Sequence, residues 1–211
     1  MSAPMSAEDF ARARRTLLRR DAILAPVIRK YKHRTILETP AIDPFSALVR
    51  TITSQQLSTK AAATIHRRIL DLMPGGVATP ESIEKTTDEQ LRAAGLSRQK
   101  IAYVRDLAKH ASTGDLPLHD LKTLSDDDVI AAITRVKGLG RWSAEMFLMF
   151  RLHRADVLPV DDLGIVVAVQ RLYGLRKRPK PDRLRKIAEP WRPYRTVACW
   201  YLWRSLENTE D

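Results

Sequence analysis

The sequence predicts an all-α protein, and three observations support this fold class. Apolar residues recur at helical spacing along nearly the whole chain, and no segment shows the convincing alternation of a strand. Glycine is scarce, at 8 of 211 residues, while hydrophobic residues make up 44%. Ser, Thr, Asp and Glu gather where apolar stretches begin, as is typical of helix N-termini. The length suffices for one large domain or two small helical lobes around a sizeable core.

The apolar spacing divides the chain into about ten helices with short connections. A loop through Thr39–Pro40 and Asp43–Pro44 and a turn at Pro74–Gly76 interrupt the first half. Thr79 and Thr87 each begin a short helix with acids in its first turn. One predicted helix begins at residue 45 and runs into a polar break at residues 54–58. The other predicted helices span residues 8–20, 22–31, 59–73, 98–112, 125–135, 142–153, 161–173, 182–188 and 191–207.

The balance of charge favours a polyanionic partner. Lys and Arg number 36 against 25 Asp and Glu, which gives a net charge of +11. Each phosphate neutralised by a basic side chain releases condensed counterions, so such a surplus favours binding to nucleic acid. A protein that is basic for other reasons would have the same composition, and charge alone does not separate the two.

The cysteine count and the apolar segments exclude several other classes. Cys199 is the only cysteine, which rules out an internal disulfide framework, a Cys-rich zinc site and a four-cysteine iron–sulfur cluster. No stretch approaches the ~18–20 apolar residues of a membrane span, and the Arg-rich N-terminus lacks an apolar signal core. We therefore expect no membrane partner and a reducing compartment.

A glycine turn between two amphipathic helices is the first candidate binding site. Gly138 and Gly140 flank Leu139, and glycines at alternate positions allow a sharp turn with uncovered amide groups. These amides lie at the start of the next helix, where the helix dipole also favours an anion. The turn is therefore suited to hold one phosphate, although an ordinary connection between two helices could use the same glycines.

Four segments, in order, resemble the helix–hairpin–helix DNA glycosylase superfamily, in particular its 3-methyladenine DNA glycosylase II branch. They are Arg50–Ser58, Lys137–Ala144, Leu158–Gly164 and Pro190–Trp203. The resemblance implies a two-lobed helical fold with the active-site cleft between the lobes, in a compact form without the N-terminal β domain of larger members. It assigns residues 1–45 and 161–211 to one lobe, and residues 46–160, with the hairpin at about 125–153, to the other.

The resemblance identifies the second acid of the Asp161–Asp162 pair as catalytic. Asp162 would stabilise the oxocarbenium character that develops on the sugar, or orient the attacking water. Asp161 would then cap the following helix. Read without the other segments, both acids would be ordinary helix caps. An alkylated purine already carries positive charge and leaves without protonation, so one carboxylate can suffice.

One position predicts the subclass of enzyme. In the lyase members of the superfamily a lysine near the start of the second hairpin helix attacks the sugar, and here that residue is Trp142. Lys137 is displaced from that position and is expected to face phosphate. We therefore expect a monofunctional glycosylase that uses water. The missing cysteines also argue against the iron–sulfur branches of the superfamily.

The resemblance also implies the remaining site residues. Gln56 would intercalate into the gap left by the flipped nucleotide, with Leu57 as the next choice, whereas Gln55 is expected to satisfy backbone. The base pocket would consist of Trp142, Trp200, Met146 and Leu163. The residues expected to bind DNA are Gln56, Leu57, Ser58, Lys137, Gly138, Gly140, Arg141 and Ser143.

We expect that the protein requires no cofactor and contains no iron–sulfur cluster. Family members bind Na⁺ or K⁺ at the hairpin through main-chain carbonyls, here those of Thr134, Val136 and Leu139. We expect a monomer that acts on double-stranded DNA containing damaged bases, nucleoid-associated in the cytoplasm of a bacterium or nuclear in a eukaryote. Two alternatives stay open: a non-catalytic helix–hairpin–helix DNA-binding protein, and a glycosylase for hypoxanthine or ethenoadenine.

Overall fold

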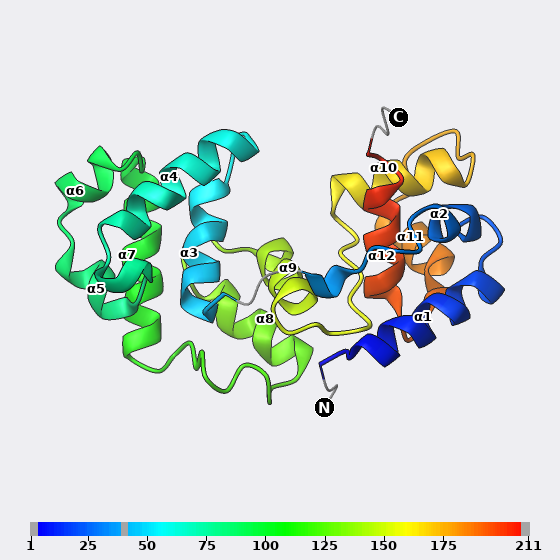
Figure 1. The fold of residues 1–211 in the computed structure, drawn as a ribbon, viewed down its shortest axis with the longest axis horizontal. Helices are drawn as coiled ribbons and strands as arrows, with labels where there is room; N and C mark the ends of the chain where they lie inside the picture. The colour runs from blue at the N-terminus through cyan, green and yellow to red at the C-terminus, as the bar shows by residue number, and fades with distance from the viewer. Residues whose placement is uncertain (1–3, 39–41, 208–211) are drawn as a thin grey trace. The chain divides into compact units, whose positions relative to one another are not determined.

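The computed structural model describes residues 4–38 and 42–207, and these contain helices and no strand (Figure 1). The prediction of an all-α protein is therefore confirmed. The predicted loop at Thr39–Pro40 lies outside the described residues. The chain forms two compact units, residues 42–147 and residues 4–38 with 148–207. Helix α9 (Arg141–Phe150) begins in the first unit and ends in the second.

The first unit gathers the middle of the chain around helix α7, which packs against α3, α5 and α6. Ile52, Ile83 and Val104 are fully buried in its core. Besides the start of α9, its helices are α3 (Pro44–Ser54), α4 (Thr59–Asp71), η2 (Pro74–Gly76), α5 (Pro80–Lys85), α6 (Asp88–Ala93), α7 (Arg98–Ser112) and α8 (Asp126–Thr134).

Helix starts in this unit follow from local sequence. Thr79 and Thr87 cap α5 and α6 where the sequence predicts helix starts, and each closes a capping box with the residue three positions later. Ser97 caps α7 and Ser125 caps α8, each by accepting a hydrogen bond from a main-chain N–H in the first turn. The bounds of α7 are those predicted from the sequence. Caps of this kind therefore set where these helices begin.

The second unit joins both ends of the chain, because α1 packs against α2 and α12, and α12 packs against α10. Leu17, Leu24 and Tyr201 are fully buried in its core. Its helices are α1 (Ala7–Arg20), α2 (Ala25–Lys30), η1 (Ile36–Glu38), α10 (Leu163–Leu172), α11 (Pro181–Ile187), η3 (Glu189–Trp191) and α12 (Arg195–Arg204).

A buried carboxylate at the end of α1 ties this unit together. Asp21 Oδ1 accepts hydrogen bonds from the amides of Ile23 and Leu24, and Oδ2 accepts from Trp191 Nε1 at 2.6 Å and from the Tyr173 hydroxyl. Burial, together with the neighbouring carboxylate, raises the pKa of Tyr173, which keeps its hydroxyl a donor. The arrangement fixes η3 and the end of α10 to α1.

Several predicted boundaries differ from the structure, at α2, α4, α9, α10 and α12 among others. The last helix begins at Arg195 and not at residue 191, because η3 and Pro193 come first. Helix α9 ends at Phe150 and not at 153, and His153 has a left-handed φ of 49° that a helix does not allow. Residues 148–160 belong to the second unit, whereas the sequence analysis placed them with the hairpin lobe.

Candidate nucleic-acid interface and active site

The glycine turn connects α8 to α9 and is closed by a hydrogen bond from Leu139 N to the Val136 carbonyl at 3.1 Å. Leu139 is 4% exposed and anchors the turn in the core. Gly138 has φ +81°, a conformation that glycine adopts without strain. A Cβ atom at Gly138 would also overlap the ring of Tyr103 on α7. Gly138 is therefore required by the fold itself, whatever the turn binds.

Gly140 differs from Gly138 in what surrounds it. A Cβ atom added to Gly140 would meet nothing within 4 Å, so the protein alone does not require glycine there. The Gly140 carbonyl accepts a hydrogen bond from Ala144 N, which begins the ladder of α9. The turn thus leads directly into a helix N-terminus, where main-chain amides and the helix dipole favour an anion. Open space at Gly140 is compatible with the close approach of a phosphate.

A carboxylate on α7 contacts Lys137 in the turn. Asp106 Oδ2 accepts a hydrogen bond from Lys137 N at 2.8 Å, and Asp106 Oδ1 lies 3.5 Å from Lys137 Nζ. Burial alone would raise the pKa of Asp106, but these two contacts with Lys137 hold it below its ordinary value. The Lys137 side chain remains 74% exposed, so a phosphate contact by its ammonium group stays a prediction.

The Gln55–Ser58 segment forms a second turn beside the hairpin. Gln55 Nε2 donates to the Gly138 carbonyl at 2.7 Å, which confirms that Gln55 satisfies backbone. Gln56 is exposed and has a left-handed φ of 57°. Leu57 is 39% exposed, and the Ser58 side chain caps α4 by accepting from Ala61 N. Both candidates for the intercalating residue are therefore on the surface.

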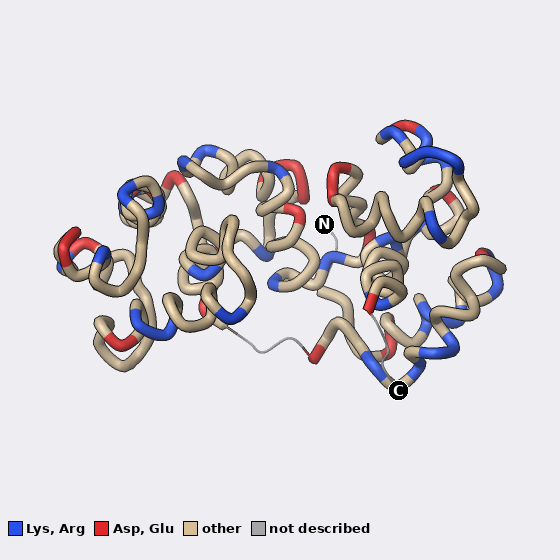
Figure 2. Tube along the Cα trace, turned by 90° about the horizontal axis from the view of Figure 1, so that it is seen from above, with Lys and Arg blue, Asp and Glu red and all other residues tan. Residues whose placement is uncertain are grey.

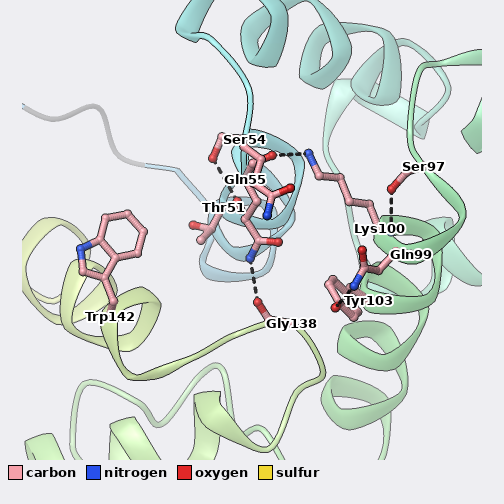
Figure 3. Close-up of a pocket in the computed structure, with 10 residues that line it drawn as sticks. Thr51, Ser54, Gln55, Ser97, Gln99, Lys100, Tyr103, Gly138 and Trp142 are labelled. Carbon is pink, nitrogen blue, oxygen red and sulfur yellow. Dashed lines mark hydrogen bonds between the residues drawn. The ribbon is translucent and has the colours of Figure 1, made fainter. Parts of the chain in front are cut away.

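A cavity of about 510 Å³ lies between this turn, the hairpin and the start of α7 (Figure 3). Hydroxyl, amide and ammonium groups share its wall with apolar surface, to which Tyr103 and Trp142 add aromatic rings. Its lining consists of Thr51, Ser54, Gln55, Gln56, Ser97, Gln99, Lys100, Tyr103, Gly138 and Trp142. The structure thus brings the two predicted DNA-binding turns together in one unit.

Asp162 caps helix α10, which corrects the assignment of the cap to Asp161. Asp162 Oδ1 accepts a hydrogen bond from Ile165 N at 2.8 Å, whereas Asp161 is exposed one residue earlier. The predicted catalytic acid is therefore itself the N-cap residue, and one side chain combines the two roles that the sequence analysis had separated. Asp162 is 8% exposed, so its carboxylate is largely removed from bulk water.

Trp203 gives the Asp162 carboxylate a second donor. Trp203 Nε1 donates to Asp162 Oδ1 at 2.9 Å, and the indole stacks on Phe150 with ring centroids 5.7 Å apart. A Cβ atom at Gly164 would lie 2.9 Å from the Trp203 ring and 3.1 Å from Asp162 Oδ1, so glycine leaves room for this contact. From the sequence, Trp203 had no role beyond ending the Pro190–Trp203 segment, because no local pattern distinguishes it.

The four predicted base-pocket residues lie in different environments. Trp200 is 6% exposed and packs edge-on against Phe10 and Tyr201, which leaves little of its ring for stacking on a base in this conformation. Trp142 is 46% exposed, at the start of α9, and Leu163 is exposed at the start of α10. Met146 is half-buried on α9. The predicted pocket roles of these four residues remain predictions.

The other predicted DNA contacts on α9 differ in exposure. The Arg141 side chain is 61% exposed, with Nε 3.0 Å from Glu145 Oε1. Ser143 is buried, which does not support a DNA contact by its hydroxyl.

Charge is unevenly distributed along the chain. Of its 36 Lys and Arg and 25 Asp and Glu, residues 41–147 hold 14 and 13, which leaves 22 and 12 for the remainder. In Figure 2 Lys and Arg positions (blue) occur along the whole trace, and the longest blue runs lie on the right. The excess of positive charge therefore lies mainly in the unit that carries Asp162, and not in the unit that carries the hairpin.

Two other features are absent from the described residues. No group of three or more His, Cys, Asp or Glu side chains there could hold a metal ion. None of the helices in the described part of the chain is long and apolar enough to cross a membrane.

Comparisons with known proteins agree with this arrangement. The family described as HhH-GPD superfamily base excision DNA repair protein matches residues 49–193. The DNA-3-methyladenine glycosylase 1 of Schizosaccharomyces pombe is 36% identical over 184 residues, which cover 86% of this chain and 80% of that protein. A structure of 3-methyladenine DNA glycosylase from the same yeast, in complex with abasic DNA, has a TM-score of 0.82 and 34% identity over 92% of this chain and 96% of that one. A DNA-3-methyladenine glycosidase from Bacillus halodurans has a TM-score of 0.80 and 38% identity, over 90% and 87%.

Proposed function

Because the chain belongs to the HhH-GPD superfamily of base excision DNA repair proteins, we propose that it is a DNA glycosylase that hydrolyses the N-glycosidic bond of alkylated purines such as 3-methyladenine and 7-methylguanine. The substrate class is drawn from the relatives named DNA-3-methyladenine glycosylase. The observation that carries the proposal is the Asp162 carboxylate, buried at a helix N-terminus and held by two donors.

The chemistry assigned to Asp162 follows from its surroundings. As the base departs, positive charge develops on the sugar, and a fixed carboxylate stabilises that charge more effectively than mobile water does. Ile165 N and Trp203 Nε1 both bind Oδ1, so the carboxylate plane is fixed before substrate arrives. The same carboxylate orients a water molecule for attack on the sugar.

A single carboxylate suffices for a cationic leaving group. Glycoside hydrolysis ordinarily uses a second carboxyl group to protonate the departing oxygen. An alkylated purine such as 7-methylguanine is already positively charged and departs as a neutral base, so no acid is needed. Because the proposed mechanism has no acid to protonate the leaving base, it favours alkylated purines over neutral lesions such as hypoxanthine or ethenoadenine.

Hydrolysis without lyase activity is the second part of the proposal. Trp142 stands where the resemblance places the Schiff-base lysine of lyase members, and an indole forms no imine. The nearest lysine in the turn, Lys137, has its ammonium group 3.5 Å from the Asp106 carboxylate. This ion pair engages Lys137 within the turn, away from the position of the Schiff-base lysine.

We further propose that the hairpin binds double-stranded DNA and that the protein acts as a monomer. Carbonyls of Thr134, Val136 and Leu139 fit a monovalent cation by chemistry, because neutral oxygen donors follow the C-terminal, negative end of α8. The Val136 carbonyl also accepts the Leu139 N–H, and its second lone pair can bind a cation. Bound Na⁺ or K⁺ would add positive charge beside the phosphate site.

The test is incubation with methylated duplex DNA followed by chromatography of the released bases. Wild-type protein is expected to release 3-methyladenine and 7-methylguanine as free bases and to leave abasic, unbroken strands. DNA binding without release of any base would favour the non-catalytic alternative. Release of hypoxanthine or ethenoadenine in preference to methylated bases would favour the other-lesion alternative, and strand cleavage would contradict the absence of lyase activity.

A further inference from the structure

The turn formed by Gln55–Ser58, hereafter the Gln56 turn, has a backbone conformation that its own sequence does not favour. Helix α3 ends at Ser54, and Gln56 has φ +57°, a region that a residue with a long side chain seldom adopts. Such a conformation persists when surrounding contacts hold it in place. The last carbonyls of a helix also lack partners within the helix. The turn therefore needs an external support.

Lys100 on α7 provides that support. Its Nζ donates to the Thr53 carbonyl at 2.7 Å and to the Gln55 carbonyl at 2.7 Å, and Figure 3 shows the second of these bonds. Both carbonyls lie just before Gln56, at the C-terminal, negative end of α3, where a cation is favoured. Lys100 is half-buried, and burial lowers the pKa of its ammonium group.

The position of Lys100 in its own helix is unfavourable. Ser97 caps α7 and accepts a hydrogen bond from Lys100 N, which places Lys100 in the first turn. The positive end of the helix dipole disfavours a cation there, so α7 alone gives no reason for a lysine. The favourable partners are the α3 carbonyls across the cavity.

The same helix also supports the hairpin. The ring of Tyr103, one turn after Lys100, occupies the space beside Gly138, and Gln99 Nε2 donates to the Tyr103 hydroxyl at 2.6 Å. Gln55 completes the connection through its hydrogen bond to the Gly138 carbonyl. Helix α7 thus contacts both DNA-binding turns, and Gln55 joins the turns to each other.

We propose that Lys100 is a positioning residue that holds the Gln56 turn in its DNA-engaging conformation and in register with the hairpin. This inference rests on the proposed function, because it assumes that both turns contact DNA. A turn that is ordered before binding loses less conformational entropy when DNA arrives. Lys100 therefore acts on the capture of duplex DNA and on nucleotide flipping, and not on the bond-breaking step.

The test compares Lys100→Met with Lys109→Met, which removes an exposed lysine from the same helix. The first measurement is hydrogen exchange of residues 55–58, with affinity for abasic duplex DNA as the second. Lys100→Met should raise exchange in this segment and weaken binding by about tenfold relative to Lys109→Met, as expected for loss of a hydrogen bond from a charged donor. Lys100→Gln keeps a donor and should lie between them.

A third measurement separates positioning from a general structural role. Single-turnover excision should fall about tenfold on methylated duplex DNA but much less on methylated single strands, where no stack has to be filled. Equal behaviour of the two Met variants, or increased exchange throughout the unit instead of at residues 55–58, would overturn the proposal. If wild-type protein releases no base, the proposed function fails, while hydrogen exchange and DNA affinity still decide the role of Lys100.

Discussion

Replacing Trp203 with Phe would remove one hydrogen-bond donor from Asp162 and keep an aromatic ring in place. In the folded protein, Trp203 Nε1 lies 2.9 Å from Asp162 Oδ1, and the indole is stacked on Phe150. A Phe side chain can maintain the stacking but has no N–H group. The substitution therefore tests whether the indole donor orients the carboxylate for catalysis.

The expected magnitude follows from the nature of the bond. A hydrogen bond to a charged group contributes about 1.5–3 kcal/mol. If that contribution is expressed fully in the transition state, the rate constant for excision falls roughly 10- to 150-fold, since 1.4 kcal/mol corresponds to about tenfold. The Ile165 amide still binds Asp162 Oδ1 in the variant, so the loss should be smaller than that caused by Asp162→Asn.

The assay is single-turnover release of methylated purine from duplex DNA, with affinity for abasic DNA measured in parallel. The rate should fall while the affinity changes little, because Trp203 acts on a carboxylate needed for bond cleavage. Trp191→Phe is a matched control, since it removes an indole donor from Asp21, in the same unit. The control should lower the melting temperature and leave the excision rate of the folded protein unchanged.

Two outcomes would refute the reasoning. A wild-type excision rate in folded Trp203→Phe would mean that Asp162 is oriented without the indole donor. Equal loss of rate in Trp191→Phe would mean that the assay follows stability and not the orientation of Asp162.

Other expected outcomes concern the hairpin, the acid and the core. Gly140→Ala should weaken binding to abasic DNA about tenfold without loss of stability, because its Cβ meets only open space in the protein; unchanged affinity would exclude close phosphate contact there. Gly138→Ala should instead lower the melting temperature by several degrees, because of its positive φ and the ring of Tyr103, and an unchanged melting curve would contradict this. Asp162→Asn should lose at least 100-fold in excision, on the order expected for an electrostatic catalytic group, and still bind DNA; full activity would identify another carboxylate as catalytic. Asp21→Ala should lower the free energy of unfolding by about 3–5 kcal/mol in chemical denaturation, because it leaves buried donors without their charged acceptor. A change below about 1 kcal/mol would contradict that role.

Features that depend on neighbouring residues were predictable from the sequence. Capping at Thr79 and Thr87, the start of α7 at Arg98 and the turn at Gly138 each involve residues within a few positions of one another. Hydrogen bonds and dihedral preferences at this range are set by local chemistry, so composition and spacing suffice to identify them. The choice between Asp161 and Asp162 as the cap of α10 was the exception. Either acid could cap the helix, and only the backbone path selects Asp162.

The sequence by itself determined the helical fold, the two turns and the Asp162 region, whereas the tertiary structure decided which side chains support them. Trp203 reaches Asp162 across 41 positions, Lys100 reaches Thr53 across 47, and Gln55 reaches Gly138 across 83. Trp200 and Trp203 lie one turn apart on α12, where residues 196–202 are all buried, so no polar face indicates which tryptophan meets the acid. Such pairings arise when distant helices pack, and periodicity along one helix carries no information about the helix against which it packs.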